Sequence, residues 1–155
     1  MKDTSDDAFR RIVRILNAGD QSEANIRAKL TRAGYSLGPI NDAVDRAKEY
    51  GFIDDARYAR LYVESKTRSG KGMDGIARDL SKMNIHINDF KDDSISELLD
   101  MDSEDQISLA VSLLARKPPR SRNLFRGAYS KLLRNGYSPN IAYAASRRWL
   151  EQNAL

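Results

Sequence analysis

Two adjacent aspartates, Asp54 and Asp55, are the residues of this chain whose type and spacing suggest chemistry most directly. They follow the apolar pair Phe52 and Ile53 and precede a segment rich in arginine and tyrosine. Paired carboxylates serve in proteins as an acid–base couple or as ligands of a metal ion. They also begin helices, where one carboxylate caps free backbone N–H groups and the other lies near the positive end of the helix dipole. The choice between these roles decides whether we expect an enzyme.

A catalytic role requires partner residues that the sequence does not supply. The chain has no cysteine and a single histidine, His86, which we expect in a loop or at a helix cap. No metalloprotease, nucleophile-elbow or EF-hand motif is present. The segment Ser69–Met73 resembles a phosphate loop only superficially, and we predict a flexible basic turn there. We therefore expect neither an enzyme nor a cofactor or metal site, with Asp54 as a helix N-cap and Asp55 in the first turn.

The elements that position these residues recur three times along the chain. Segments 26–36, 76–86 and 128–138 align, with a leucine at equivalent positions: Leu30, Leu80 and Leu132. Each leucine is followed four residues later by Gly34, Asn84 or Gly136, residue types that adopt the left-handed conformation that ends a helix. Ser36 and Ser138 then stand where the next helix begins, and Pro139 suits a first helical position.

Each copy is also preceded by a segment with apolar residues at helical spacing. These stripes are Phe9, Ile12, Val13 and Leu16; Tyr58, Leu61, Tyr62 and Ser65; and Ile107, Ala110, Val111 and Leu114. Ser103 and Gln106 form a capping-box pattern before the third. No segment of five or more residues alternates between apolar and polar residues with a period of two, so we expect no strand. The sequence predicts an all-α protein of three tandem three-helix repeats, at 1–52, 53–102 and 103–155, forming an elongated, curved array.

The positive charge is concentrated in the last of these predicted repeats. The chain as a whole carries a net charge of +4, whereas residues 103–155 carry nine Lys and Arg against three acids. All nine basic residues lie between Arg116 and Arg148, with no acid among them. Such a segment favours a polyanionic partner, either DNA phosphates or an acidic protein surface.

Fourteen cations are the candidate contacts to a filament or to DNA. Those in the middle repeat and its basic turn are Lys66, Arg68, Lys71, Arg78 and Lys82. Those in the third repeat are Arg116, Lys117, Arg120, Arg122, Arg126, Lys131, Arg134, Arg147 and Arg148. The acidic stretch 88–105 separates the two groups and argues against a duplex bound along the whole chain.

A cation also stands two residues after each repeat leucine, at Arg32, Lys82 and Arg134. If the units stack regularly, these three side chains form a line of positive charge. Each also lies in the last turn of its helix, where a cation gains about 0.3–1 kcal/mol from the helix dipole without any ligand. The sequence leaves both explanations open.

The segment Gly51–Ile85 resembles the signature of the RecX family, bacterial regulators of the RecA recombinase. The matching residues at its start are Phe52, Ile53, Asp54, Asp55, Arg57, Tyr58 and Ala59, followed by Gly72, Ile76, Leu80 and Ile85. The segment 14–30 is similar to the first repeat of the family. The sequence departs from the family pattern at Gly75, where an arginine is common, at Asp79 in place of glutamate, and at Asn84 in place of glycine.

The resemblance implies a protein that binds the RecA nucleoprotein filament and inhibits its recombinase, ATPase and coprotease activities, with a role in DNA repair, recombination and the SOS response. It implies RecA as partner and a structural role for the signature residues, while the charge of the third repeat predicts weak binding of single- or double-stranded DNA mainly there. No apolar run reaches the roughly 20 residues that span a bilayer, and the acidic N-terminus is unlike a secretory signal. We expect a cytoplasmic monomer with no membrane contact.

Two other classes of function fit parts of the sequence. A helix-turn-helix transcription regulator is the principal alternative, since segment 26–44 has two predicted helices around a glycine turn. Its recognition helix would carry Asp42, Asp45 and Glu49, which phosphates repel, whereas the third repeat offers Asn140, Arg147 and Arg148. A helical scaffold for an unrelated protein partner fits the repeats equally well.

Overall fold

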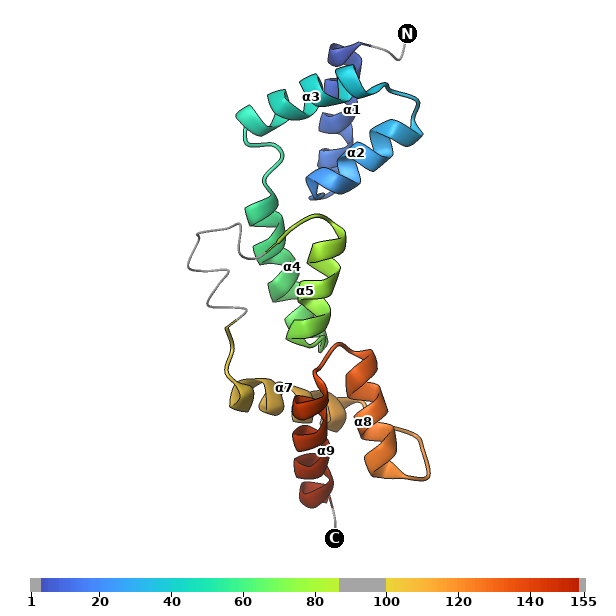
Figure 1. Cartoon of the computed structure of the whole chain (residues 1–155), viewed down its shortest axis with the longest axis vertical. Helices are drawn as coiled ribbons and strands as arrows, with labels where there is room; N and C mark the ends of the chain where they lie inside the picture. Colours follow the sequence, from blue (N-terminus) through green and yellow to red (C-terminus); the bar gives the residue numbers. More distant parts are fainter. Residues whose placement is uncertain (1–3, 87–99, 154–155) are drawn as a thin grey trace. The chain divides into compact units, whose positions relative to one another are not determined.

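A computed structural model describes residues 4–86 and 100–153, and these residues form helices joined by short connections, with no strand among them. The chain is therefore all-α, as the sequence predicts. The helices in the described ranges are α1 (Ser5–Asn17), α2 (Glu23–Arg32), α3 (Leu37–Glu49), α4 (Asp55–Ser69), α5 (Met73–Lys82), α7 (Ser103–Arg116), α8 (Leu124–Arg134) and α9 (Pro139–Asn153) (Figure 1). A further helix predicted in the second repeat falls largely on residues 87–99, outside the described ranges.

The chain divides into two compact units. An amino-terminal unit comprises residues 1–60 and 82–85, and a carboxy-terminal unit comprises residues 61–81 and 86–155. The first boundary therefore falls within α4, at Arg60. Each unit has its own buried cluster of apolar side chains.

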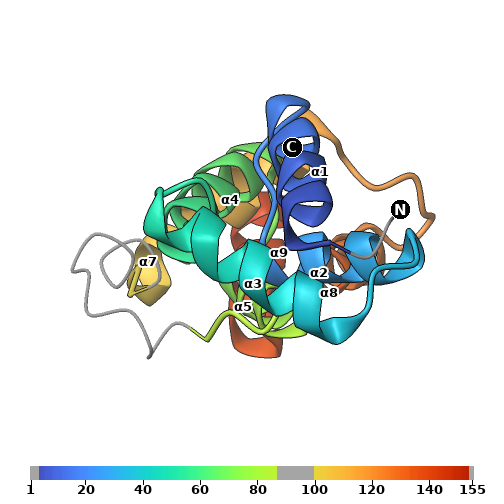
Figure 2. The same ribbon diagram turned by 90° about the horizontal axis from the view of Figure 1, so that it is seen from above.

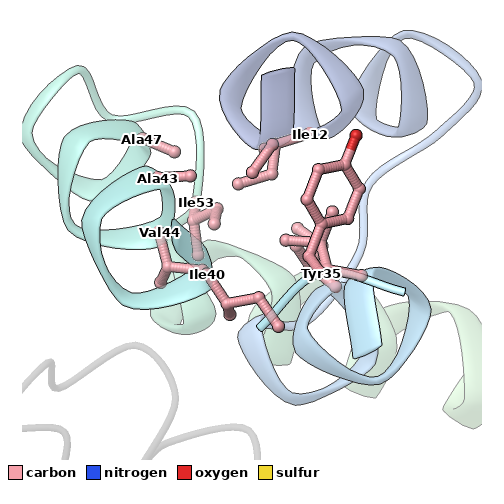
Figure 3. Close-up of a cluster of buried hydrophobic side chains, with 10 residues drawn as sticks. Ile12, Tyr35, Ile40, Ala43, Val44, Ala47 and Ile53 are labelled. Atoms are coloured by element: carbon pink, nitrogen blue, oxygen red, sulfur yellow. The ribbon is translucent and has the colours of Figure 1, made fainter. Parts of the chain in front are cut away.

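The core of the amino-terminal unit lies among α1, α2 and α3. Figure 1 shows α3 lying across α1, and Figure 2 shows the same three helices turned by 90°. Ile12 of α1, Ile26 and Leu30 of α2, and Val44 of α3 are completely buried. Figure 3 shows side chains from α1 and α3, with Tyr35 and Ile53 from the connections, directed into one cluster. Ile12 of the predicted stripe is fully buried, and Phe9 and Leu16 pack against the same cluster, but Ala8 and Ile15 complete the buried face of α1 in place of the predicted Val13.

The helix ends follow the prediction from the aligned copies. Leu30, Leu80 and Leu132 are fully buried on α2, α5 and α8. The chain then reverses through Gly34 at φ +99°, Asn84 at φ +58° and Gly136 at φ +90°. The left-handed conformation is accessible to glycine without a steric penalty and to asparagine at a modest one. Each helix therefore ends where the sequence predicts.

The helix starts follow the prediction with two exceptions. Asp54 caps α4, since its Oδ1 accepts from the N–H of Arg57 at 3.1 Å, and Ser138 Oγ accepts from the N–H of Ile141 at 3.4 Å. Ser36 precedes α3 but makes no side-chain capping hydrogen bond to that helix. The capping residue of α7 is Asp102, which accepts from the N–H of Asp105 at 2.8 Å, so the expected cap at Ser103 is wrong by one residue.

The buried face of α4 also differs from the prediction. Ala59 and Val63 are its buried apolar residues, whereas Leu61 is 43% exposed. The predicted stripe of Tyr58, Leu61, Tyr62 and Ser65 is therefore wrong by about one residue. The prediction placed the larger side chains on the buried face of α4. In the structure the smaller side chains of Ala59 and Val63 fill the interior instead.

Three glycines hold α5 against the end of α8 in the carboxy-terminal unit. The N–H of Gly72 donates to the carbonyl of Asn135 at 2.7 Å, and the N–H of Gly75 donates to the carbonyl of Gly136 at 2.9 Å. A Cβ at Gly75 would lie 2.7 Å from the Cα of Gly136. Free donors at the start of α5 thus meet free acceptors at the end of α8. The turn predicted to be flexible is instead packed, with Gly70 and Gly72 buried.

The rest of the carboxy-terminal core joins α7, α8 and α9. Leu114 of α7, Leu132 of α8 and Ala145 of α9 are fully buried, and Trp149 is 5% exposed. The stripe predicted from Ile107 to Leu114 supplies the α7 side of this cluster. This core fixes α8, which carries three of the five cations that line the cleft described next.

Candidate anion-binding surface

The principal candidate site is a cleft on α8 and the connection that precedes it. The cleft has a volume of about 730 Å³, and no acidic residue lines it. Five of the predicted cations do line it: Arg120, Arg122, Arg126, Lys131 and Arg134. The structure thus brings together residues that the sequence gives only as a charged segment. We call this feature the α8 cleft.

The connection that forms one wall of the α8 cleft is held close to the helix. A Cβ at Gly127 would lie 2.1 Å from Oγ of Ser121 and 3.0 Å from Cβ of Pro119, so glycine is needed for this approach. The Ser121 hydroxyl donates to the carbonyl of Asn123 at 2.6 Å, and the ammonium of Lys131 donates to the carbonyl of Lys117. A wall fixed in this way loses little conformational freedom when a ligand binds.

The start of α8 adds to the positive potential of the cleft. Asn123 is the N-cap, and its Oδ1 accepts from the N–H of Arg126 at 3.0 Å. The first turn of a helix carries roughly half a positive charge. Guanidinium groups bind phosphate and carboxylate oxygens through paired hydrogen bonds. The α8 cleft therefore has the chemistry to bind a phosphate backbone or a group of carboxylates.

The remaining cations of the third predicted repeat lie elsewhere. Arg148 pairs with Glu104 through two hydrogen bonds of 2.6 and 3.2 Å, which lower the pKa of Glu104 and raise that of Arg148. Arg147 lies 3.8 Å from Glu151 and 6.0 Å from the ring centroid of Tyr143. Glu104 lies 44 residues from Arg148 in the sequence, so the charge pattern alone did not reveal this pair.

Arg116 and Lys117 precede the wall of the cleft and are exposed. Arg116 is close enough to Tyr137 to act on that phenol. Burial raises the pKa of Tyr137 to about 12, and Arg116 only partly opposes this effect. Tyr137 is therefore a neutral core residue at physiological pH, and it does not line the α8 cleft.

The cations predicted on α4 and α5 do not line the α8 cleft. Lys71 is ion-paired with Asp79, and Lys66 lies 5.4 Å from the ring centroid of Tyr62. Arg68 and Arg78 are exposed, and Lys82 lines a separate depression of about 430 Å³ with Tyr58 and Asn25. Asp79 therefore neutralises one member of the group that the sequence treats as free.

The aspartate pair has a structural role in the amino-terminal unit. Besides the cap formed by Asp54, Oδ1 of Asp55 accepts from the N–H of Glu23 at 2.9 Å, at the start of α2. Burial raises the pKa of Asp55, and this hydrogen bond only partly opposes the increase. Burial would also raise the pKa of Glu23, but hydrogen bonds from Lys48 and Arg27 lower it overall.

The contact between Asp55 and Glu23 spans 32 residues, and no local pattern in the sequence predicts it.

Among residues 4–86 and 100–153, no three His, Cys, Asp or Glu side chains are grouped so as to hold a metal ion. In the same ranges no helix has the length and apolar character needed to cross a membrane.

Comparison with known proteins identifies relatives across most of the chain, although no protein-family model matches it. The chain is 31% identical over 113 residues to the regulatory protein RecX of Haemophilus influenzae, a match that covers 72% of this chain and 71% of that protein. It is 29% identical to the regulatory protein RecX of Mycolicibacterium smegmatis, covering 84% of this chain and 73% of the relative. A match to the Clostridium perfringens protein, at 27% identity over 83% of this chain, spans only 61% of that relative.

Solved structures agree in fold. The crystal structure of RecX from Lactobacillus salivarius superposes with a TM-score of 0.70 at 19% identity, covering 94% of this chain and 96% of that one. A second crystal structure, of a regulatory protein RecX, gives a TM-score of 0.67 at 20% identity and covers 88% of this chain and 68% of that one. At these identities the likeness concerns the fold alone. The match to the Haemophilus influenzae protein shows that the chain belongs to the RecX family of regulatory proteins, which are not enzymes.

Proposed function

We propose that this protein binds the RecA nucleoprotein filament in the cytoplasm and inhibits its recombinase, ATPase and coprotease activities. Membership of the RecX family supports the choice of partner. The proposal includes a monomer built of three tandem three-helix repeats, at residues 1–52, 53–102 and 103–155, in an elongated, curved array. The recurrence of a buried leucine followed by a left-handed residue in α2, α5 and α8 supports the threefold repeat.

The α8 cleft is the observation that carries the proposal of a binding role. Five cations converge on one preformed surface that no acidic residue lines. A RecA filament presents DNA phosphates, and phosphates neutralise clustered Arg and Lys side chains with release of counterions. We therefore assign the third repeat to DNA in the filament, with a weaker affinity for free single- or double-stranded DNA.

The predicted cations outside the cleft have secondary roles in this proposal. Arg68, Arg78 and Lys82 are exposed and add to the attraction of a polyanion at long range. Lys71 and Arg148 contribute less, since each already has a carboxylate partner. The signature residues from Phe52 to Tyr58 stabilise the fold rather than contact the filament.

Inhibition of RecA strand exchange tests this assignment. The cleft variant is R120Q/R126Q/R134Q, and its control is R10Q/K48Q/R57Q, which removes the same charge from cations that have carboxylate partners. We expect the cleft variant to need a substantially higher concentration for half-inhibition, while the control inhibits like the wild type. Equal inhibition by the cleft variant and the wild type would remove the cleft from the mechanism.

A further inference from the structure

A second group of cations surrounds a smaller depression in the amino-terminal unit. Arg11 and Ile15 of α1 line it on one side, and Lys29 and Arg32 of α2, with the following Ala33, line it on the other. Its volume is about 280 Å³, less than half that of the α8 cleft. No acidic residue lines this depression. We call it the α1–α2 site.

The carboxylates of the amino-terminal unit neutralise other cations and leave these three without an acidic partner. Five basic residues of the unit pair with carboxylates: Arg10, Arg27, Arg46, Lys48 and Arg57. Within residues 4–86 and 100–153, neither Arg11, Lys29 nor Arg32 has a carboxylate oxygen within ion-pair distance. Three of the unit's cations without a carboxylate partner thus line one depression, whereas Arg14, Arg60 and Lys82, which also lack an ion pair in the described ranges, do not line it.

The aligned copies place the same residue types at the α8 cleft. Lys29 aligns with Lys131 and Arg32 aligns with Arg134, and both of the latter residues line that cleft. The middle copy has Asp79 at the position of Lys29, and Asp79 is ion-paired with Lys71. Of the three aligned helices, α2 and α8 therefore have both the Lys–Arg pair and a depression that no acidic residue lines, whereas α5 lacks the lysine.

We propose that the α1–α2 site binds a phosphate group of a single-stranded DNA backbone, as a second anchoring point besides the α8 cleft. Three cations around one depression outweigh the roughly half negative charge at the end of α2. The last-turn position therefore does not prevent an anion from binding. Arg11, which comes from the middle of α1, gains nothing from that helix end and instead completes the set of donors.

The choice of DNA as the ligand rests on the proposed function, whereas the presence of an anion site rests on the geometry alone. An acidic segment of a protein would present carboxylates to the same donors, so the experiment must separate these two ligands. The site variant is R11Q/K29Q/R32Q, and the matched control is again R10Q/K48Q/R57Q, which also removes two arginines and one lysine.

The test measures the affinity of the full chain for a fluorescently labelled oligothymidylate strand at several salt concentrations. Each phosphate contact on a single strand contributes about 0.7 to the slope of log affinity against log salt. We expect the site variant to show a slope shallower by about 0.7 for each phosphate it no longer binds, and the control to keep the wild-type slope. Circular dichroism of both variants confirms that the helices are intact.

Three results overturn the inference. Equal slopes for the site variant and the control would overturn the site: two unchanged slopes would show that no phosphate binds there, and two shallower slopes would show that only total charge matters. An unchanged affinity for DNA combined with weaker binding to RecA filaments would identify the ligand as protein carboxylates. Tighter binding of inorganic phosphate than of the oligothymidylate strand by the wild-type chain would indicate a site for a small free anion. The cleft variant is measured in parallel, because a loss of DNA binding there but not at the α1–α2 site would leave the proposed function intact.

Discussion

Substitution of Gly75 by alanine tests the backbone contact between α5 and α8. The added Cβ would lie 2.7 Å from the Cα of Gly136 and 3.2 Å from Cε of Lys71. The lysine chain has room to move, but the glycine backbone is held by its own turn at φ +90°. The two segments must therefore separate, and the bonds from Gly72 and Gly75 to the end of α8, now 2.7 and 2.9 Å, must lengthen.

The expected cost combines overpacking with weakened hydrogen bonds. Overpacking of a filled interior costs typically about 1–3 kcal/mol, and each backbone hydrogen bond contributes about 1 kcal/mol. The free energy of unfolding should fall by about 2–5 kcal/mol, which for a chain of this length lowers the melting temperature by roughly 4–20 °C.

Thermal unfolding followed by circular dichroism measures this difference. Gly38 is the matched control, because a Cβ there would meet nothing within 4 Å and its φ does not lie in the left-handed region. G38A should raise stability by about 0.4–1 kcal/mol through the reduced freedom of the unfolded chain. A G75A protein that melts within a degree or two of the wild type would refute the close packing of α5 on α8.

Three further predictions concern single side chains. In D55N the amide oxygen still accepts from Glu23 N–H without the buried charge, so we expect unfolding in urea at neutral pH to show the variant at least as stable as the wild type and more stable than D55A. Because the pKa of Asp55 is raised, the protonated carboxyl group contributes its full stability below pH 3.8, and this contribution is lost as pH rises through the pKa of the folded state. The advantage of D55N over the wild type should therefore disappear in acid. S146A should raise the melting temperature and increase the free energy of unfolding by about 1–2 kcal/mol, because Oγ of Ser146 is buried without a hydrogen-bond partner among the described residues. N84G should stabilise the chain by up to about 1 kcal/mol in the same melting assay, whereas N84A should destabilise it, because residue 84 has a φ of +58°.

Local rules predicted the helix ends well. The cap at Asp54 and the reversals at Gly34, Asn84 and Gly136 depend on residues within one turn of each other, so the sequence contains the required information. The error at Ser103 is also local, because two capping residue types, Asp102 and Ser103, stand side by side. The prediction of the buried face of α4 was wrong because small and large apolar residues are interspersed along this helix, and the sequence does not show which of them face the interior.

The sequence could not predict the pairs that the fold brings together. Arg148 donates a hydrogen bond to Glu104 on another helix, and Asp55 accepts one from the N–H of Glu23 at the start of α2. The contact between Gly75 and Gly136 likewise joins segments that no periodicity connects. The charge density of the third repeat was evident from composition, but the arrangement of its cations around Gly127 required the structure.

The single-strand-dependent ATPase of RecA, titrated with the wild-type chain and with the cleft variant, tests the central claim most directly. A filament regulator that acts through the α8 cleft predicts that ATP hydrolysis falls as the wild-type chain is added, and that the cleft variant needs a higher concentration for the same decrease. An ATPase rate that stays unchanged when the wild-type chain is equimolar with RecA would contradict the proposed function.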